Sequence, residues 1–302
     1  MLNARLPLVG TVWMVTLLVA AGGARAAFVT EYFNNYGTGS GSNSNSSDDV
    51  DIAGLNGGSG WSGAWTGSNG PEYYSSSSPY GNSLTFGATG YDNSANETTA
   101  GQDGLARRQQ GGGGNTNGAI AYRPFAGMTG TVWVSALVAG NSTTPEMILW
   151  LDEPGDVAGN RDYIGIRYIN VTNGIRAAVM TNGTVDVSNS TSFSGTMTYL
   201  IIAKIGMNVA GGNDRLDFWA KTSSSDVSNE ALLGTPLYSK SGGDFFGATF
   251  DGVGMSFNIN GSRMDAIRVS NDTNAFSQVV GVPEPASLAL IGVGALALLR
   301  RR

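Results

Sequence analysis

The sequence predicts an all-β fold, a single β-sandwich of the jelly-roll type. Apolar and polar residues alternate with a period of two in several segments between residues 130 and 270, which is typical of half-buried β-strands. Turn-forming pairs such as Asn182-Gly183 separate these segments, and Asn-Gly favours the tight turns of β-hairpins. No helical periodicity is apparent between the two ends of the chain. Many short strands joined by hairpin turns favour a sandwich or a jelly roll.

The composition indicates an exported protein rather than an intracellular enzyme. Of 302 residues, 45 are glycine and 13% are charged, against a charged fraction of about 25% in ordinary soluble domains. The chain has no cysteine and no histidine, which excludes disulfides, thiolate chemistry and a Ser-His-Asp triad. Its net charge is −6, and five of its 17 basic residues, Arg5, Arg25 and Arg300 to Arg302, lie near the two ends, so the middle of the chain is more acidic still. Nucleic acid is therefore excluded as a partner.

Residues 1–26 predict a secretory signal peptide, recognised by the Sec export machinery. A positive start precedes an apolar stretch over residues 8–21, and Ala24 and Ala26 form a small-x-small cleavage site. Cleavage after Ala26 would leave Ala27 as the first residue of the mature chain. The alternative is an uncleaved membrane anchor, but the apolar stretch is short and ends in small residues.

A low-complexity stretch, YGTGSGSNSNSSDDVD, lies near the start of the predicted mature chain, at residues 36–51. Such a composition predicts a flexible loop. Its acidic end, Asp48, Asp49 and Asp51, offers hard oxygen ligands, so calcium is the one candidate cofactor of this sequence. The alternative is a solvated acidic loop that holds no ion.

A glycine-rich segment with several aromatic residues follows the acidic loop. Trp61, Trp65, Tyr73 and Tyr74 have polar neighbours, and aromatic faces in such a setting suit the CH groups of a sugar ring. These residues are the candidate surface for carbohydrate stacking. The alternative is structural, with both tryptophans covering the sandwich where glycines allow close packing.

The strands of the sandwich follow from the alternating segments. Val132, Val134, Ala136 and Val138 would share one face of a strand, and the nearly continuous apolar run over residues 198–206 predicts a central strand covered on both sides. The sequence predicts three further strands. The first has Ile164, Ile166 and Tyr168 on one face, the second has Leu216, Phe218 and Ala220 on one face, and the third has Ile267 and Val269 on one face. Since no linker is apparent, residues 27–277 are predicted to form one domain, and residues 278–302 a separate C-terminal signal.

The C-terminal signal combines three features in a fixed order. Pro283-Glu284-Pro285 precedes an apolar run over residues 288–299, and Arg300, Arg301 and Arg302 end the sequence. As a helix the apolar run would rise about 20 Å, short of a ~30 Å hydrocarbon core. The arginines, however, form a stop-transfer cluster, and the prolines keep the tripeptide extended. A short transmembrane helix is predicted.

This order of features resembles the PEP-CTERM sorting signal of Gram-negative bacteria. The resemblance covers residues 282–302. It implies that an exosortase, an integral-membrane protease and transpeptidase, recognises the tripeptide and processes the tail. The apolar helix would then hold the protein in the inner membrane only until processing.

The rest of the mature chain resembles concanavalin-like or laminin-G-like jelly-roll domains. The similarity rests on the tryptophan segment LNGGSGWSGAWTGSNGPEYY, on YLIIAKIGMNVAGGNDRLDFW and on the closing RMDAIRV. It implies a jelly roll and raises the question of glycoside hydrolysis, because some enzymes of this type are laminarinase-like.

The sequence argues against that hydrolase activity. Retaining glycosidases place two carboxyl groups about 5 Å apart. The nearest candidates are Asp152, Glu153 and Asp156, but neighbouring residues of a strand point to opposite faces and Pro154-Gly155 turns the chain. We therefore expect a non-enzymatic envelope or matrix protein that accompanies exopolysaccharide and biofilm. The alternative is a dedicated lectin that uses the aromatic residues, with or without calcium.

Overall fold

The computed structural model describes most of the predicted sandwich. The predicted signal peptide and the predicted C-terminal transmembrane helix lie outside the described residues. The described residues are 27–33, 49–68, 71–75, 84, 86, 104–108, 119–140, 146–152, 162–169, 174–181, 183–187, 192–194, 197–209, 213–243, 246, 248–257 and 262–281.

Two antiparallel sheets form the molecule, which confirms the predicted sandwich. The nine-stranded sheet has the order β14 (Tyr238–Ser241), β13 (Asn213–Lys221), β12 (Thr198–Val209), β7 (Thr131–Ala139), β16 (Arg263–Ser270), β5 (Gly104–Arg108), β4 (Pro71–Ser75) and β2 (Asp49–Asp51), and β1 (Phe28–Glu31) also pairs with β16. The seven-stranded sheet has the order β11 (Thr184–Val187), β10 (Gly174–Thr181), β9 (Asp162–Ile169), β8 (Glu146–Asp152), β15 (Phe250–Phe257), β6 (Ala119–Met128) and β3 (Thr66–Ser68).

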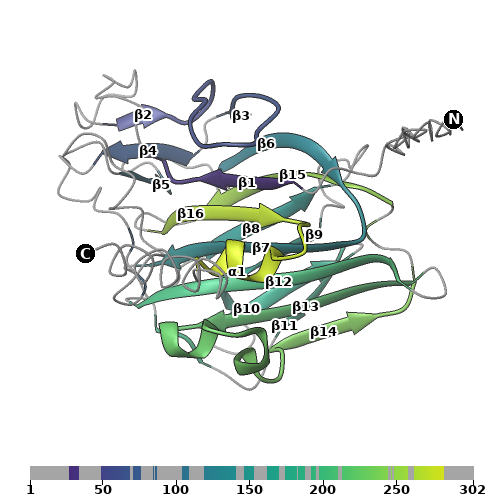
Figure 1. Ribbon diagram of the computed structural model, residues 1–302. Coiled ribbons are helices and arrows are strands. Elements are labelled where there is room, and N and C mark those ends of the chain that lie inside the picture. The colour runs from purple at the N-terminus through teal and green to yellow at the C-terminus, as the bar shows by residue number, and fades with distance from the viewer. Residues whose placement is uncertain are drawn as a thin grey trace, which may run out of the picture.

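The chain crosses repeatedly between the two sheets, as Figure 1 shows. From β6 it passes to β7 in the other sheet, returns for β8 to β11, and crosses again for β12 to β14. β15 and β16 then enter the middles of opposite sheets, so that the last strands pair with strands far away in sequence. Such non-local pairing is typical of jelly rolls. The predicted two-residue turn is confirmed where Thr181 pairs with Thr184, and Gly183 has a φ of 73°.

The main core lies between the sheets, and it contains the predicted inward faces. Val132, Val134, Ala136 and Val138 are all buried there. The other face of β7 is buried too, because Trp133, Leu137 and Ala139 belong to a second cluster on the outer side of the nine-stranded sheet. The expectation that β7 is half-buried was therefore wrong. The predicted two-sided burial of β12 is confirmed by Ile201 on the inner face and Ile202 on the outer face.

A β-bulge explains how β16 contributes side chains to both hydrophobic clusters. The register shifts between Asp265 and Arg268, and Ala266 has a φ of 49°. The extra residue reverses the alternation, so Met264 and Ile267 both reach the main core although they are three positions apart. Ala266 itself faces the outer cluster.

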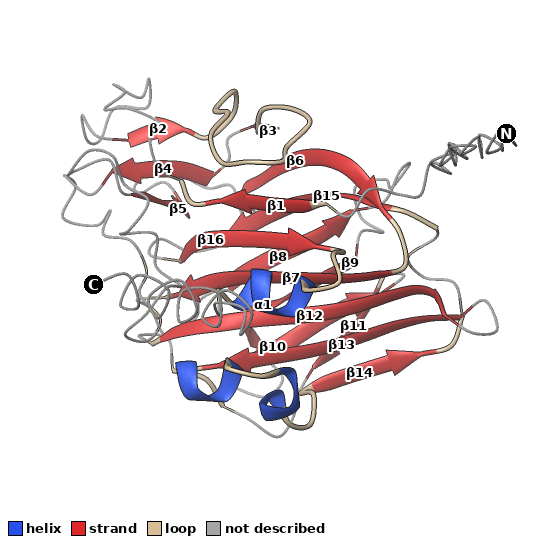
Figure 2. Cartoon of the chain, viewed as in Figure 1, coloured by secondary structure: helices blue, strands red, loops and turns tan. Residues whose placement is uncertain are grey.

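Three short helices of the described residues cover the outer cluster. The sequence shows no helical periodicity there because four to six residues are too few to establish a helical period. The three are the 3-10 helices η3 (Ser224–Val227) and η4 (Glu230–Leu233) and the α-helix α1 (Ala275–Val280). All three lie over the nine-stranded sheet (Figure 2). α1 crosses the domain boundary predicted at residue 277, because Val279 and Val280 are buried against the sheet. Within the described residues, no helix has the length and hydropathy needed to span a membrane.

Candidate functional site

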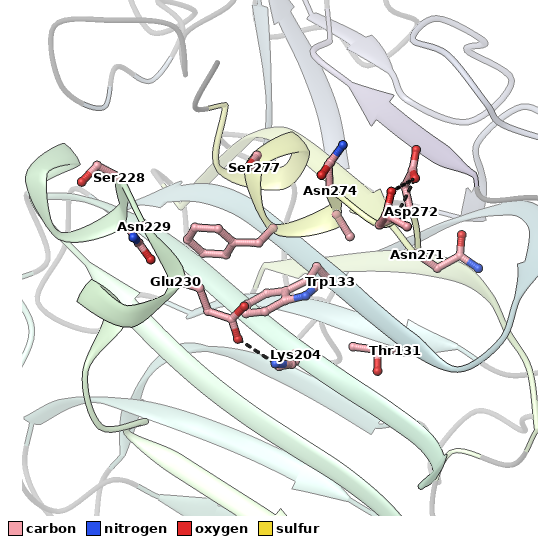
Figure 3. Close-up of a pocket in the computed structure, with 13 residues that line it drawn as sticks. Thr131, Trp133, Lys204, Ser228, Asn229, Glu230, Asn271, Asp272, Asn274 and Ser277 are labelled. Atoms are coloured by element: carbon pink, nitrogen blue, oxygen red, sulfur yellow. Dashed lines mark hydrogen bonds and ion pairs between the residues drawn. The ribbon is translucent and has the colours of Figure 1, made fainter. Parts of the chain in front are cut away.

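Two adjoining hollows lie on the outer side of the nine-stranded sheet. The first, of about 630 Å³, lies between α1 and the 3-10 helices over β7 and β12 (Figure 3). The second, of about 770 Å³, extends over β13. The two share Lys204, Asn229 and Glu230. We call the two together the outer groove.

An ion pair stands where the two hollows join. Lys204 Nζ lies 2.6 Å from Glu230 Oε1, and the two side chains are 35% and 51% exposed. The Lys204 ammonium also lies 5.0 Å from the centre of the Trp133 ring. Glu230 begins η4, whose start is capped by Asn229: its Oδ1 accepts a hydrogen bond of 2.9 Å from the backbone N–H of Ala231. The cap holds Glu230 beside the lysine.

The floor of the outer groove is aromatic but covered. Trp133 and Trp219 stack with ring centres 6.0 Å apart, and Phe276 meets Trp133 edge-on at 5.1 Å. The Trp219 indole donates a hydrogen bond of 3.0 Å to the carbonyl of Gly234. Trp133 is 4% exposed and Trp219 is 6% exposed. The rings therefore stiffen the floor and offer no open face for stacking.

The rim beside α1 is built by the turn that follows β16. The Asp272 carboxylate accepts hydrogen bonds from the hydroxyl and the backbone N–H of Thr273, and these lower its pKa. Asn271 Oδ1 accepts a hydrogen bond of 2.8 Å from the backbone N–H of Ala27, so the rim is tied to the start of β1. The side chain of Asn274 makes no capping bond to α1, and its amide borders the groove.

Charges in the outer groove nearly cancel. Lys204 and Arg215 face Glu230, Asp217 and Asp272, giving two positive and three negative side chains, a net charge of −1. Arg215 Nε donates to Asp217 Oδ2 at 2.7 Å, and this bond raises the pKa of Arg215. The arrangement offers many hydrogen-bond donors and acceptors without a strong field of either sign.

The predicted carbohydrate-stacking residues take a different place. Trp65 is 1% exposed in the main core, and its indole donates to Glu31 Oε2 at 3.1 Å. Trp61 is partly buried against the same core, and its indole donates to the Thr30 carbonyl at 2.8 Å. The stacking prediction is therefore wrong for Trp65, because a sugar ring has no access to it. Trp61 serves packing, and the side chains of Tyr73 and Tyr74 lie outside the described set.

These tryptophans enclose a buried ion pair. The Arg123 guanidinium contacts the Glu31 carboxylate, and both side chains are fully buried. Arg123 also donates to the Gly63 carbonyl at 2.8 Å and lies 4.7 Å from the centre of the Trp61 ring. Because Glu31 lies in β1 and Arg123 in β6, the pair joins the nine-stranded sheet to the seven-stranded sheet.

Other predicted site residues fall on or beyond the edge of the described structure. Asp49 and Asp51 lie in β2, where they pair with Tyr74 and Glu72 of β4. Asp48 lies outside the described residues. Ala27 is the first described residue, whereas Ala24 and Ala26 lie outside, as do Pro283 to Pro285 and Arg300 to Arg302. Among the described residues, no cluster of three or more acidic side chains could hold a metal ion.

A further carboxylate lies on the outer face of the seven-stranded sheet. Glu146 is 8% exposed and lies 3.1 Å from Arg167 Nη2. Burial raises the pKa of Glu146, although the charge of Arg167 acts in the opposite direction. Arg167 Nη1 also donates to the Tyr163 hydroxyl at 2.9 Å. Asp152 ends β8 in the same sheet, and Glu153 and Asp156 lie outside the described residues.

No sequence pattern pointed to the outer groove. A single residue gives a signal, because Lys204 interrupts an otherwise apolar strand that is covered on both sides. A cation at such a position needs either solvent or a partner. Its partner Glu230 begins η4, and Asp272 lies in the turn after β16. Both are far from Lys204 in the sequence, so no local sequence pattern relates the three residues.

The C-terminal residues match a known sorting signal. Residues 281–302 match the family model of the PEP-CTERM protein-sorting motif. The chain carries a PEP-CTERM motif. The predicted resemblance is thereby confirmed, and a PEP-CTERM motif indicates an exported protein that an exosortase processes and that is sorted to the envelope. None of the curated proteins compared with this PEP-CTERM chain is similar to it in sequence.

Solved structures similar to this PEP-CTERM chain are also sandwiches, but their likeness is weak. The globular domain of T. cruzi calreticulin is 13% identical with a TM-score of 0.42, over 78% of this chain and 94% of that one. Bacillus licheniformis β-glucanase is 12% identical with a TM-score of 0.41, over 82% and 99%. Lectin II from Ulex europaeus is 7% identical with a TM-score of 0.34, over 55% and 86%. These values carry no argument about function.

Proposed function

We propose that this chain is a non-enzymatic protein of the cell envelope or extracellular matrix of a Gram-negative bacterium, associated with exopolysaccharide or biofilm. The Sec machinery exports it, its C-terminal helix holds it in the inner membrane for a time, and an exosortase then processes the tail. The sandwich works as a structural or adhesive module. The match of residues 281–302 to the sorting motif carries this proposal.

The end of the folded domain supports it. α1 ends at Val280, and Gly281 adopts a left-handed conformation with a φ of 68° that terminates the helix. The sorting motif begins at that same glycine. Pro283 follows two residues later, so only a few residues separate the packed domain from the tripeptide that the exosortase would recognise.

Four of the described carboxylates favour a role without catalysis. Glu31, Glu146, Asp217 and Glu230 each lie in an ion pair with a neighbouring arginine or lysine. A glycosidase needs a pair of carboxyl groups facing one substrate, one of them free to donate a proton. The chain also lacks histidine, the commonest general base.

The intact mass of the mature protein tests the proposal. The protein would be purified from its native host and from a strain that lacks the exosortase. We expect a chain that starts near Ala27 in both strains and that ends near Pro283 to Pro285 in the first strain only. An added mass at that end would indicate covalent transfer to another molecule.

A variant with Pro283→Ala and Glu284→Ala serves as a control, since it should keep the full tail in both strains. A tail that still includes Arg302 in the parent strain would contradict the proposal. Hydrolysis of a β-glucan by the purified protein would contradict the non-enzymatic part.

A further inference from the structure

We infer that the outer groove binds an uncharged polysaccharide chain, with the Lys204–Glu230 pair at the centre of the site. This inference rests on the proposed function, because it names the site through which the sandwich would hold the matrix. The site lies on the outer side of the nine-stranded sheet, whereas the tryptophan segment packs against the core between the two sheets. Sequence patterns did not single out the residues of the site.

The central ion pair suits neighbouring hydroxyl groups. Lys204 Nζ has three donor hydrogens, and Glu230 has two acceptor oxygens, while the bond between them at 2.6 Å uses one of each. A hydroxyl both donates and accepts, so two adjacent hydroxyls can bond to the ammonium and the carboxylate at once. Because both side chains are partly exposed, a ligand reaches them without moving the backbone.

The charge balance favours a neutral ligand over an ionic one. The outer groove has a net charge of −1, and the whole chain has a net charge of −6. An acidic polysaccharide would meet repulsion from both. The amides of Asn229 and Asn274 and the hydroxyl of Thr131 add uncharged donors and acceptors along the first hollow (Figure 3).

The size and stiffness of the outer groove favour a chain rather than a single sugar. Hollows of about 630 and 770 Å³ meet at the central ion pair and continue across β7, β12 and β13. The stacked Trp133 and Trp219 rings below them hold the floor in place. A preformed site loses less freedom on binding than a flexible one.

A peptide partner fits this groove poorly. β12 pairs with β7 on one side and with β13 on the other, so no free strand edge is present beneath the groove for an added strand. The aromatic floor is covered, so it forms no pocket for an apolar anchor residue. Recognition by side-chain hydrogen bonds remains, which suits a polyhydroxylated chain.

Affinity gel electrophoresis of the processed protein would test the inference. The probes are three neutral polysaccharides (dextran, a galactomannan and a β-glucan) and one acidic polysaccharide, alginate. We expect a neutral polysaccharide to retard the protein and alginate to leave it unretarded. Lys204→Met and Glu230→Gln should each weaken the neutral binding at least tenfold, since each removes a hydrogen bond to a charged group.

Two matched substitutions serve as controls. Lys221→Met and Asp226→Asn change the same kinds of side chain outside the outer groove, and both should bind as the parent does. Circular dichroism would confirm that all four variants keep the strand content of the parent.

Several results would overturn the inference. The inference would be wrong if no neutral polysaccharide retarded the protein or if alginate retarded it more strongly. It would also be wrong if the groove variants bound as the parent does, or if Lys204 bound a protein ligand instead. The mass measurement separates these results from a failure of the proposed function. A correctly processed chain without groove binding would leave the sorting proposal standing, whereas an unprocessed chain would refute it whatever the groove binds.

Discussion

At the scale of single residues, the most consequential feature is the buried pair of Arg123 and Glu31. Removing two charges from water is costly, and the pair is tolerated because each group has several partners. Glu31 accepts hydrogen bonds from the Phe33 backbone N–H at 2.8 Å and from the Trp65 indole at 3.1 Å. Strand β1 therefore depends on one arginine from β6.

Replacing Arg123 with methionine should destabilise the protein strongly. Glu31 would remain buried without its cation, which typically costs about 3–5 kcal/mol. Lys204→Met is the control, because an exposed ion pair contributes roughly 0–1 kcal/mol. Guanidinium unfolding of the mature chain measures both. Equal midpoints for the two variants would contradict the assigned role of Arg123.

The buried Glu146 carboxyl predicts a pH dependence. Because burial raises its pKa in the folded state above the usual 4.5, folding favours the protonated form. This contribution to stability is complete below pH 4.5 and is lost as the pH rises through the folded-state pKa. The free energy of unfolding of the parent, relative to Glu146→Gln, should therefore fall between acidic and neutral pH. Urea unfolding across that range measures the difference, and a constant or rising difference would refute the prediction.

At the scale of elements, close packing between strands depends on particular glycines. A Cβ atom on Gly165 in β9 would lie 2.5 Å from the Met147 carbonyl oxygen and 3.0 Å from Ile148 Cα, both in the backbone of β8. Backbone atoms of a paired strand cannot move aside as a flexible side chain can. The spacing of β8 and β9 therefore requires glycine at this position.

Gly165→Ala should cost about 1–3 kcal/mol, the usual range for overpacking. Gly63→Ala is the matched control, because its Cβ would meet only Pro124 at 3.5 Å, an ordinary contact. Thermal unfolding would show a lower midpoint for the first variant and an unchanged one for the second. A tolerated Gly165→Ala would mean that the two strands can separate slightly.

At the scale of the whole molecule, α1 decides where the domain ends. Ser135 Oγ donates a hydrogen bond of 2.6 Å to the Val279 carbonyl, and Val279 and Val280 are 0% and 3% exposed. The helix closes the outer cluster immediately before the sorting motif. Processing by an exosortase near Pro283 would therefore leave the sandwich complete.

Truncation would test this boundary. A chain that ends at Gly281 should unfold at the same denaturant concentration as one that ends at Pro285. A chain that ends at Ser277 should be clearly less stable, because it lacks two buried valines worth about 1.5–3 kcal/mol each. If all three chains unfold alike, α1 is not part of the cooperative domain.

Local patterns accounted for much of the fold and for the sorting motif. Alternation along β7 and β13 predicted their inward faces correctly, because neighbouring residues of a strand must point to opposite sides. Burial was less predictable. The alternation along β7 predicts a strand with one buried face, but α1 and the 3-10 helices pack on the nine-stranded sheet and cover the second face of β7 as well.

The sequence by itself determined that this chain is β-rich and that it ends in a PEP-CTERM motif, since both signals lie within short stretches of residues. The tertiary structure decided which side chains meet. It buried Trp65 against Glu31, and it brought Lys204 beside Glu230 and Trp133 to form the outer groove. These contacts join residues up to 71 positions apart, because neighbouring strands of a jelly-roll sheet, such as β7 and β12, come from distant parts of the chain.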